Sequence, residues 1–374
     1  MAHEFRKSLI ILCVVIIAMI VFIKLAFFDY PQEVIPARLI KYSLIDDKND
    51  NNQDKSFDAR LPKVKDKPVR LLFFGDMMLD RHVGEKINQY GVDYLFKKLA
   101  STTEGDFFAG YDIVSSNLEG VVTNEGEHYA PQMSYDFAFH PDLILETKNY
   151  GFNFFSLANN HFSDQGERGI IETRNNLDNL NINYTGCEDG LVGECSGKVI
   201  EINNKKIGMA GFSMVYSKLD ENDVNKIVSN LASTTDLVIV NIHWGKEYEH
   251  NFNIVQQKTA HLIIDAGADI IIGHHSHVVQ GIEIYDNKPI FYSLGNFIFD
   301  QYFSPDTQEG LAIGVEIEND AERYYLYPLK SKLSQVELIK EEDKESFLNK
   351  LISWSQIDSG YREQIKTGKF IISN

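Results

Sequence analysis

The chain has 374 residues, of which 44% are hydrophobic and 24% are charged, so it can bury a sizeable core without cross-links. Its formal net charge is −18 and its pI is near 5.0. This excess of acid argues against a nucleic-acid partner, which needs a basic surface, and against adhesion to anionic lipid through a basic face.

The first apolar segment, residues 8–28, predicts a membrane anchor. Its one charged residue is Lys24, and at about 1.5 Å per residue a helix of this length spans roughly 31 Å, one hydrocarbon core. Arg6 and Lys7 precede it and acidic residues follow, so the positive-inside rule places the N-terminus in the cytoplasm. The alternative is a cleaved signal peptide, but no small-x-small cleavage pattern follows the segment.

The sequence therefore predicts a single-pass protein of the cytoplasmic membrane, with its main domain outside. Residues 1–28 form a cytoplasmic tip and a transmembrane anchor. Residues 29–68 form an extracytoplasmic stalk, because 46–55 (DDKNDNNQDK) contains no apolar residue to bury. A globular domain follows over 69–330, and 331–374 is a C-terminal helical extension packed on it.

From Val69 onward, strand and helix patterns alternate, which is typical of βαβ units and a largely parallel sheet. The apolar runs that predict strands are 69–75, 111–117, 152–158, 236–242 and 268–273. The stretches that predict helices lie near 81–100, 141–150, 166–180, 222–233 and 254–267.

The later part of the chain predicts hairpins and a terminal helix. Residues 197–212 and 281–294 each carry a polar pair, Asn203-Asn204 and Asp286-Asn287, between two apolar runs. Two more strands are expected at 311–317 and 323–329. Residues 341–355 have an amphipathic helical pattern, whose apolar face we expect to pack on the core rather than to recruit a partner.

Two cysteines flank a glycine-rich loop, Cys187 before it and Cys195 after it. Outside the cytoplasmic membrane two such thiols tend to oxidise together, so a local disulfide is expected. The alternative is two unrelated thiols. Cys13 lies within the predicted span, where it acts as an apolar filler.

Polar side chains follow the predicted strands at the point where each one ends. The apolar runs end in Asp76, in Glu119, in Asn160 with His161, in His243, and in the segment His274-His275-Ser276-His277. Imidazole is the commonest metal ligand in proteins, and open α/β sheets place their sites at the carboxyl ends of strands. The pattern predicts one crevice able to hold a cation; the plainer interpretation is a set of solvated polar loops.

These strand-end segments together resemble one protein family. The matching motifs are Gly75-Asp76-Met77-Met78-Leu79-Asp80-Arg81, Asn117-Leu118-Glu119-Gly120, Ala158-Asn159-Asn160-His161, His243-Trp244-Gly245, the His275/His277 pair with Val278-Val279-Gln280, and Tyr292-Ser293-Leu294-Gly295-Asn296-Phe297. They resemble the CapA family of bacterial poly-γ-glutamate capsule synthesis proteins, which is related to the calcineurin-like metallophosphatases. The resemblance covers roughly residues 69–300.

The resemblance implies a fold and a set of roles. The implied fold class is α/β, the calcineurin-like metallophosphatase fold, with two mixed β-sheets sandwiched between helices. In that superfamily two metals about 3.5–4 Å apart clamp a phosphate and activate a water. By position, His161 would assist the leaving group. Apart from the resemblance, Arg81 follows Asp76 closely in the sequence and is expected to pair with it or to hold an anionic substrate. The implied metal ligands are Asp76, Glu119, Asn160, His243, His275 and His277.

Two departures from the superfamily pattern bear on the metal count. Met78 stands where the first motif, Asp-x-His, has histidine, and a thioether is a poor ligand for hard divalent ions. Glu119 stands where the bridging residue is usually Asp. We therefore expect one well-held divalent ion (Zn, Mn or Fe) and a weaker or absent second.

Other interpretations of the site stay open at this stage. In a metal-free protein, Asp76 and Glu119 would accept hydrogen bonds from histidines and from Arg81. His274 could compete with its neighbours as a ligand, and His82 could replace the missing imidazole, although a surface position is the plainer interpretation of His82. The acidic segment 125–128 is expected to be a mobile loop.

Three functions fit these observations. The first is a membrane-anchored accessory enzyme of poly-γ-glutamate or capsule synthesis, and the second is an extracellular metal-dependent phosphoesterase of another pathway. The third is a non-catalytic domain that binds the polymer or a membrane synthase complex. The partner would be an anionic polymer or a phosphate-bearing substrate, with the metal, Arg81 or Lys205-Lys206 as the source of positive charge. No phosphate-binding loop motif is present, so ATP-driven ligation by this chain is not expected.

Overall fold

The computed structural model describes residues 67–373, except 103–104 and 319–320. The predicted membrane anchor, and the predicted stalk except its last two residues, lie outside these described residues. Within the described part, no helix combines the length and the apolar character needed to cross a membrane.

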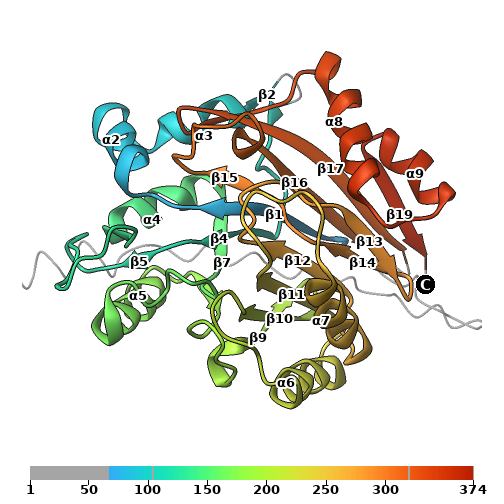
Figure 1. Cartoon of the computed structure of the whole chain (residues 1–374), viewed down its shortest axis with the longest axis horizontal. Helices are drawn as coiled ribbons and strands as arrows, with labels where there is room; N and C mark the ends of the chain where they lie inside the picture. Colours follow the sequence, from blue (N-terminus) through green and yellow to red (C-terminus); the bar gives the residue numbers. More distant parts are fainter. Residues whose placement is uncertain (1–66, 103–104, 319–320, 374) are drawn as a thin grey trace, which may run out of the picture. The chain divides into compact units, whose positions relative to one another are not determined.

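The larger sheet has nine strands and is mixed (Figure 1). β1 (Val69–Met77), β4 (Ile113–Leu118), β7 (Phe152–Ser156) and β8 (Asn183–Thr185) run parallel. On the other side of β1, the antiparallel strands are β16 (Glu309–Glu318), β17 (Ala321–Lys332) and β18 (Gln335–Leu338). β15 (Asn296–Ile298) pairs in parallel with the end of β1 and places Asn296 beside Asp76.

The smaller sheet has six strands in the order β13-β14-β12-β11-β10-β9. Its centre is parallel and consists of β10 (Lys205–Ser213), β11 (Leu237–His243), β12 (Ile270–His274) and β14 (Lys288–Phe291). β9 (Gly197–Ile202) and β13 (Ile282–Tyr285) form the two predicted hairpins with β10 and β14. Asn203, Asn204, Asp286 and Asn287 all have positive φ, as tight hairpin turns require.

The helices lie close to their predicted positions. The main ones are α2 (Arg81–Tyr90), α3 (Asp93–Ala100), α4 (Pro141–Thr147), α5 (Gly166–Asn179), α6 (Glu221–Thr234), α7 (Ile254–Asp265), α8 (Glu341–Trp354) and α9 (Ser359–Lys366). The stretch predicted as one helix near 81–100 is two helices, because Gly91 adopts φ 79 and ends α2. The short strands are β2 (Ser101–Thr102), β3 (Gly105–Asp106), β5 (Val121–Val122) and β6 (Ala138–Phe139).

Alternation along the strands divides the core into layers. Leu71 and Phe73 of β1 pack between the two sheets, whereas Leu72 and Phe74 pack against α2–α5 on the outer face of the larger sheet. In β11, Ile239 faces the other sheet while Val240 packs against α6 and α7. Figure 1 shows α6 and α7 beneath the smaller sheet. Two mixed sheets between helices confirm the predicted α/β architecture.

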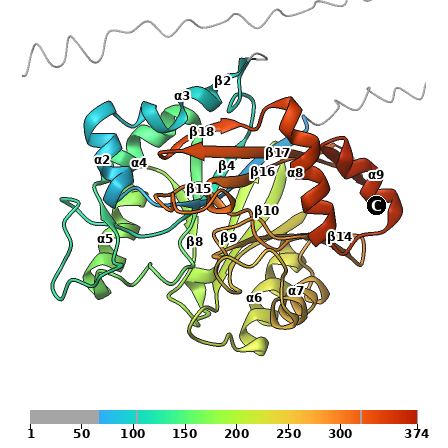
Figure 2. The same ribbon diagram turned by 45° about the horizontal axis from the view of Figure 1, so that its top comes forward.

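The C-terminal segment combines helices with strands. The apolar face of α8 is buried in the core through Phe347, Leu348 and Leu351, as its amphipathic pattern predicts. β18 and β19 (Lys369–Ser373), however, join the larger sheet beside β17, so residues after 330 are not only helical. Figure 2 shows α8 and α9 together at one end of β17.

The structure confirms the predicted local disulfide. Cys187 and Cys195 are bridged, with their Cα atoms 5.3 Å apart. The bridge closes the loop between β8 and β9.

At the end of β1, the backbone of Gly75 and Asp76 lies very close to the backbone of Gly295. The Asp76 N–H donates to the Gly295 carbonyl at 3.0 Å, and a Cβ added to Gly75 would lie 1.8 Å from that same carbonyl oxygen. No rotamer relieves a clash between a Cβ and backbone, so one of the two segments would have to move.

We therefore predict that Gly75→Ala lowers the free energy of unfolding by about 1–3 kcal/mol or more. The matched control is Gly193→Ala, since a Cβ there meets nothing within 4 Å, and it should stay within about 0.5 kcal/mol of the parent. Urea denaturation of the two variants tests this. Equal stability of both variants would show that β1 does not approach the Gly295 turn so closely.

Candidate metal centre

The predicted site residues meet at the carboxyl ends of the parallel strands. Asp76 lies at the end of β1, Glu119 follows β4 and His243 ends β11. The strand ends of the two sheets lie close together here. The His275 N–H, just after β12, donates to Asp76 Oδ2 at 3.2 Å. One atom each from Asp76, Glu119 and His243 lies within 4.8 Å of the others.

Three donor atoms from three segments form one compact group. His243 Nε2 lies 2.8 Å from Asn160 Oδ1 and 3.1 Å from His275 Nδ1. Burial, reinforced by the His275 ring, holds the pKa of His243 well below its usual value. Burial and the charge on His277 lower the pKa of His275 to about 4. Both rings are therefore neutral near pH 7, the form that binds metals.

His277 joins the two carboxylates. Its Nδ1 lies 3.5 Å from Asp76 Oδ2 and its Nε2 lies 3.8 Å from Glu119 Oε1. Burial opposes charge on His277, but Glu119 and Asp76 outweigh it and raise its pKa to about 9. Burial raises the pKa of Glu119 to about 7, although His277 works against this. The backbone at His275 and His277 has φ of 88° and 55°, a conformation that costs free energy and is concentrated at functional sites.

Burial would also raise the pKa of Asp76, yet its pKa lies well below the usual value. The adjacent His274 and His277 rings outweigh the cost of burial. Asp76 Oδ1 lies 3.4 Å from His274 Nδ1 and also accepts a hydrogen bond from Asn117 Nδ2 at 2.8 Å. The carboxylate is thus held ionised in the interior.

The chemistry of the donor set fits a divalent metal. Glu119 Oε1 is buried without a hydrogen-bond partner, and leaving a buried carboxylate oxygen unsatisfied is costly. A cation bound by Glu119, Asn160, His243 and His275 would satisfy it. Asp76 and His277, together with Glu119, would supply the expected second position, which would be the weaker one because a metal there has to displace the His277 proton. Nitrogen and oxygen donors suit zinc, manganese or iron.

Met78 does not contribute to this donor set. Its side chain packs in the hydrophobic cluster beneath α2, and its Sδ accepts the Asp80 N–H at 3.0 Å. His274 is also directed away from the pocket, since its Nε2 lies 3.5 Å from Asn241 Oδ1. Its other nitrogen, Nδ1, lies 3.4 Å from Asp76 Oδ1.

Asn117 is a site residue to which the sequence assigned no role. Its Nδ2 lies 3.3 Å from His243 Nδ1 and 3.5 Å from Glu119 Oε2, in addition to its bond with Asp76. Asn159 fixes its orientation by donating to Asn117 Oδ1 at 3.1 Å. The sequence could have indicated this role, because Asn117 lies two residues before Glu119, and residues two apart in an extended chain face the same side.

The structure corrects one of the two roles predicted for Arg81, the pairing with Asp76, whereas the binding of an anionic substrate by Arg81 stays a prediction. Its guanidinium pairs with Asp300 rather than with Asp76 or Glu119, and it lies over the Phe137 ring at 4.8 Å. Of the metal-free network, the part in which Arg81 bonds to those carboxylates is therefore wrong, whereas the expected contacts between histidines and Asp76 are present. His82 pairs with Glu85 at the surface, in line with its plainer interpretation, and does not replace the missing imidazole.

His161 lines the pocket beside Glu119. Its Nδ1 is 2.8 Å from Asp164 Oδ2, and its Nε2 is 3.7 Å from Glu119 Oε1. Its ring packs on Phe137 at 4.2 Å between centroids. Asp164 thus orients the ring so that Nε2 faces the site.

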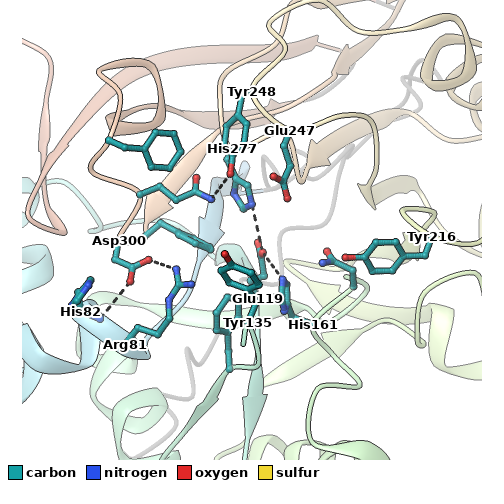
Figure 3. Close-up of a pocket in the computed structure, with 15 residues that line it drawn as sticks. Arg81, His82, Glu119, Tyr135, His161, Tyr216, Glu247, Tyr248, His277 and Asp300 are labelled. Carbon is teal, nitrogen blue, oxygen red and sulfur yellow. Dashed lines mark hydrogen bonds and ion pairs between the residues drawn. The ribbon is translucent and has the colours of Figure 1, made fainter. Parts of the chain in front are cut away.

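A pocket of about 570 Å³ opens over these residues. Figure 3 shows Glu119, His161 and His277 at its centre, with Arg81 and Asp300 on one side and Tyr216 on the other. Its remaining lining residues are His82, Tyr135, Phe137, Asn160, Glu247, Tyr248, Phe299, Gln301 and Phe303.

Fold and site together define an α/β protein that carries a buried carboxylate, amide and imidazole cluster between two mixed sheets. The model of the family described as "Bacterial capsule synthesis protein PGA_cap" matches residues 70–301. The chain belongs to this family.

Two relatives carry names from capsule and polyglutamate synthesis. The chain is 31% identical over 252 residues to "Capsule biosynthesis protein CapA" of Bacillus anthracis, covering 62% of this chain and 60% of that protein. It is 29% identical over 317 residues to "PGA biosynthesis protein CapA" of Bacillus subtilis, covering 77% and 82%.

Among solved structures, a hypothetical protein from Thermus thermophilus matches with a TM-score of 0.40 at 13% identity, covering 72% of this chain and 98% of that one. Vacuolar Protein Sorting 29 from Cryptosporidium parvum matches with a TM-score of 0.32 at 10% identity, covering 73% and 96%. The fold assignment accordingly rests on the sheets described above.

We predict that the full-length protein, purified in detergent, contains about one divalent ion per chain. His243→Ala should lower the metal content by at least about tenfold, since it removes a central ligand. His82→Ala, a pocket-edge histidine, should leave the content unchanged. Elemental analysis of the three proteins measures this, and equal metal in all three would contradict the assigned ligands.

Proposed function

We propose that this protein is a membrane-anchored, extracytoplasmic accessory protein of poly-γ-glutamate capsule synthesis that acts through a metal-dependent, phosphoesterase-like site. The observation that carries the proposal is the buried group of Asp76, Glu119 and His243 beneath an open pocket. Asn160 and His275 contact His243, and His277 lies beside both carboxylates. Family membership supplies the biological setting.

The chain's own groups suit hydrolysis of an anionic ester. A bound divalent ion would polarise a phosphoryl oxygen and lower the pKa of a bound water. His161, oriented by Asp164, presents Nε2 to the pocket, where it would donate a proton to the leaving-group oxygen. Asn117 and His274 hold Asp76 in position. Arg81 is neutralised by Asp300, so it assists an anionic ligand only if that ion pair opens.

The proposed cellular location rests on the sequence. Residues 8–28 would anchor the chain, with residues 1–7 in the cytoplasm and the catalytic domain outside. The Cys187–Cys195 bridge supports this placement, because disulfides persist in oxidising compartments. A membrane synthase complex would supply the polymer, since the chain has no motif for nucleotide binding.

We predict that His161→Ala and His243→Ala reduce polymer production to the level of a strain without the protein, whereas His82→Ala does not. Loss of a general acid costs about 10²- to 10⁴-fold in rate, and loss of a metal ligand removes the metal. Cell-surface glutamate polymer is measured after acid hydrolysis, with immunoblots confirming equal protein in membranes.

Two outcomes would redirect the proposal. Full polymer production in both variants would indicate a non-catalytic role in binding the polymer or the synthase. Chelator-sensitive turnover of a phosphate monoester together with unchanged polymer would place the enzyme in another pathway.

The membrane topology has its own test. A C-terminal epitope tag should be digested when protease is added to intact spheroplasts, and an N-terminal tag should survive, because residues 8–28 separate the two compartments. A cytoplasmic protein serves as the control for lysis. Protection of both tags would contradict the outward orientation.

A further inference from the structure

Exposed aromatic side chains gather at the mouth of the pocket. Tyr216 is 80% exposed, Tyr135 72%, Phe303 69% and Tyr248 46%, and all four line this one pocket. Among the described residues, Tyr90 is the one other aromatic side chain with comparable exposure. Large apolar side chains left in water are unfavourable and, when clustered, mark binding surfaces.

The backbone beneath Tyr216 is fixed although its ring is exposed. The Asp189 carboxylate accepts hydrogen bonds from the N–H groups of Val215, Tyr216 and Ser217 at 2.7, 3.0 and 2.9 Å. Asp189 itself lies in the loop closed by the disulfide. Because the backbone that carries the exposed ring is already fixed, binding through this ring costs less entropy.

Tyr248 and Phe303 support each other. Tyr248 has φ 64, which is uncommon for an aromatic residue, and its N–H donates to the Ser276 carbonyl at 2.8 Å. Gln301 donates to the Tyr248 hydroxyl at 3.2 Å. The two rings meet edge to face, 5.4 Å apart and 83° from parallel, so they form no slot for a single planar base.

The segment that carries Tyr135 is also held by side-chain contacts, which include His128 of the loop predicted at 125–128; the mobility of that loop stays a prediction. His128 bridges Asp80 and Asp136, with both contacts at 3.0 Å. Asp136 also accepts the Met133 N–H at 3.1 Å, which fixes the backbone on both sides of Tyr135.

Charge at the mouth argues against a densely charged polyanion. The pocket is lined by the carboxylates Glu119, Glu247 and Asp300. Its one arginine is already paired with Asp300, and His277 lies between Asp76 and Glu119. The lining therefore offers no unpaired arginine or lysine to a ligand with closely spaced carboxylates, whereas a ligand with uncharged faces and one anionic group needs only the metal.

We infer that the mouth of the pocket is a subsite for the sugar rings of a phosphate-bearing glycan, which stack on Tyr135, Tyr216, Tyr248 and Phe303 while the phosphate reaches the metal centre. This inference rests on the proposed function and names the substrate class of the same site. Pyranose rings present C–H faces that pack on aromatic rings and hydroxyls that suit Glu247 and Gln301. Figure 3 shows the rings of Tyr248 and Tyr216 at different sides of the pocket, a spread that fits successive sugars better than one flat group.

The test compares glucose 1-phosphate with glycerol 3-phosphate, which has the same anionic group but no ring. Binding to the full-length, metal-loaded protein is measured by titration calorimetry, and contact with sugar-ring protons by saturation-transfer NMR. We expect glucose 1-phosphate to bind at least tenfold more tightly. The double variant Tyr216→Ala/Phe303→Ala should lose that advantage while keeping its metal and its affinity for glycerol 3-phosphate.

Two control variants sharpen the comparison. Tyr90→Ala removes an exposed aromatic ring outside the pocket and should change nothing. Tyr216→Phe with Phe303→Tyr keeps both ring faces and should retain the preference for glucose 1-phosphate.

The outcomes separate this inference from the proposed function. Equal binding of the two phosphates by a metal-loaded, active protein would overturn the glycan subsite and leave the metal chemistry standing. Tighter binding of a γ-linked glutamate oligomer through the same rings would also overturn it. Saturation transfer to the sugar ring in a protein that binds no metal would sustain the subsite and refute the hydrolytic site.

Discussion

The close approach of β1 to the Gly295 turn and to the loop after β12 is the constraint on which the site depends. Asp76 belongs to the larger sheet, whereas His243, His275 and His277 lie on the smaller sheet or directly after its strands. The two sets of donors meet only because the backbone at Gly75 lies against Gly295 and the Asp76 carboxylate accepts the His275 N–H. A side chain at Gly75 would meet the Gly295 carbonyl, so glycine at this position is what allows the Asp76 carboxylate to lie against the imidazoles.

That same approach removes water from the charged groups and sets their protonation. Asp76, Glu119, His243 and His277 are all buried, so each is charged only where a neighbour offsets the cost of leaving water. His277 carries its proton between two carboxylates, whereas His243 and His275 lie beside other imidazoles and stay neutral. The site therefore combines neutral imidazoles at His243 and His275 with a buried Glu119 oxygen that has no hydrogen-bond partner. A divalent cation would satisfy that oxygen.

Sequence patterns predicted most of the fold, because its strands are strongly apolar and its hairpins turn on Asn-Asn and Asp-Asn pairs. They also predicted which side chains meet, since parallel strands end at a common edge. Contacts set by tertiary packing could not be predicted from the sequence. Arg81 was expected near Asp76 because the two are close in sequence, yet it pairs with Asp300, 219 positions away. β19 was missed for a similar reason, because its short alternation of buried and exposed residues becomes a strand only when β17 offers an edge. The role of Asn117 could have been predicted, since Asn117 lies two residues before Glu119 and residues two apart in an extended chain face the same side.

The disulfide links the scaffold to the mouth of the pocket. The bridge between Cys187 and Cys195 closes the loop that carries Asp189, and Asp189 holds the backbone on which Tyr216 is presented. A covalent closure that supports a ligand-facing loop is useful only where thiols oxidise. The disulfide beneath the pocket mouth and the apolar N-terminal segment have no residue in common. Both support the proposal that the main domain lies outside the cytoplasmic membrane. In the proposed setting, an acidic chain would meet its ligand through a bound metal ion and aromatic rings rather than through a basic surface. Around Glu119 the structure places the donor groups and the exposed rings that this requires.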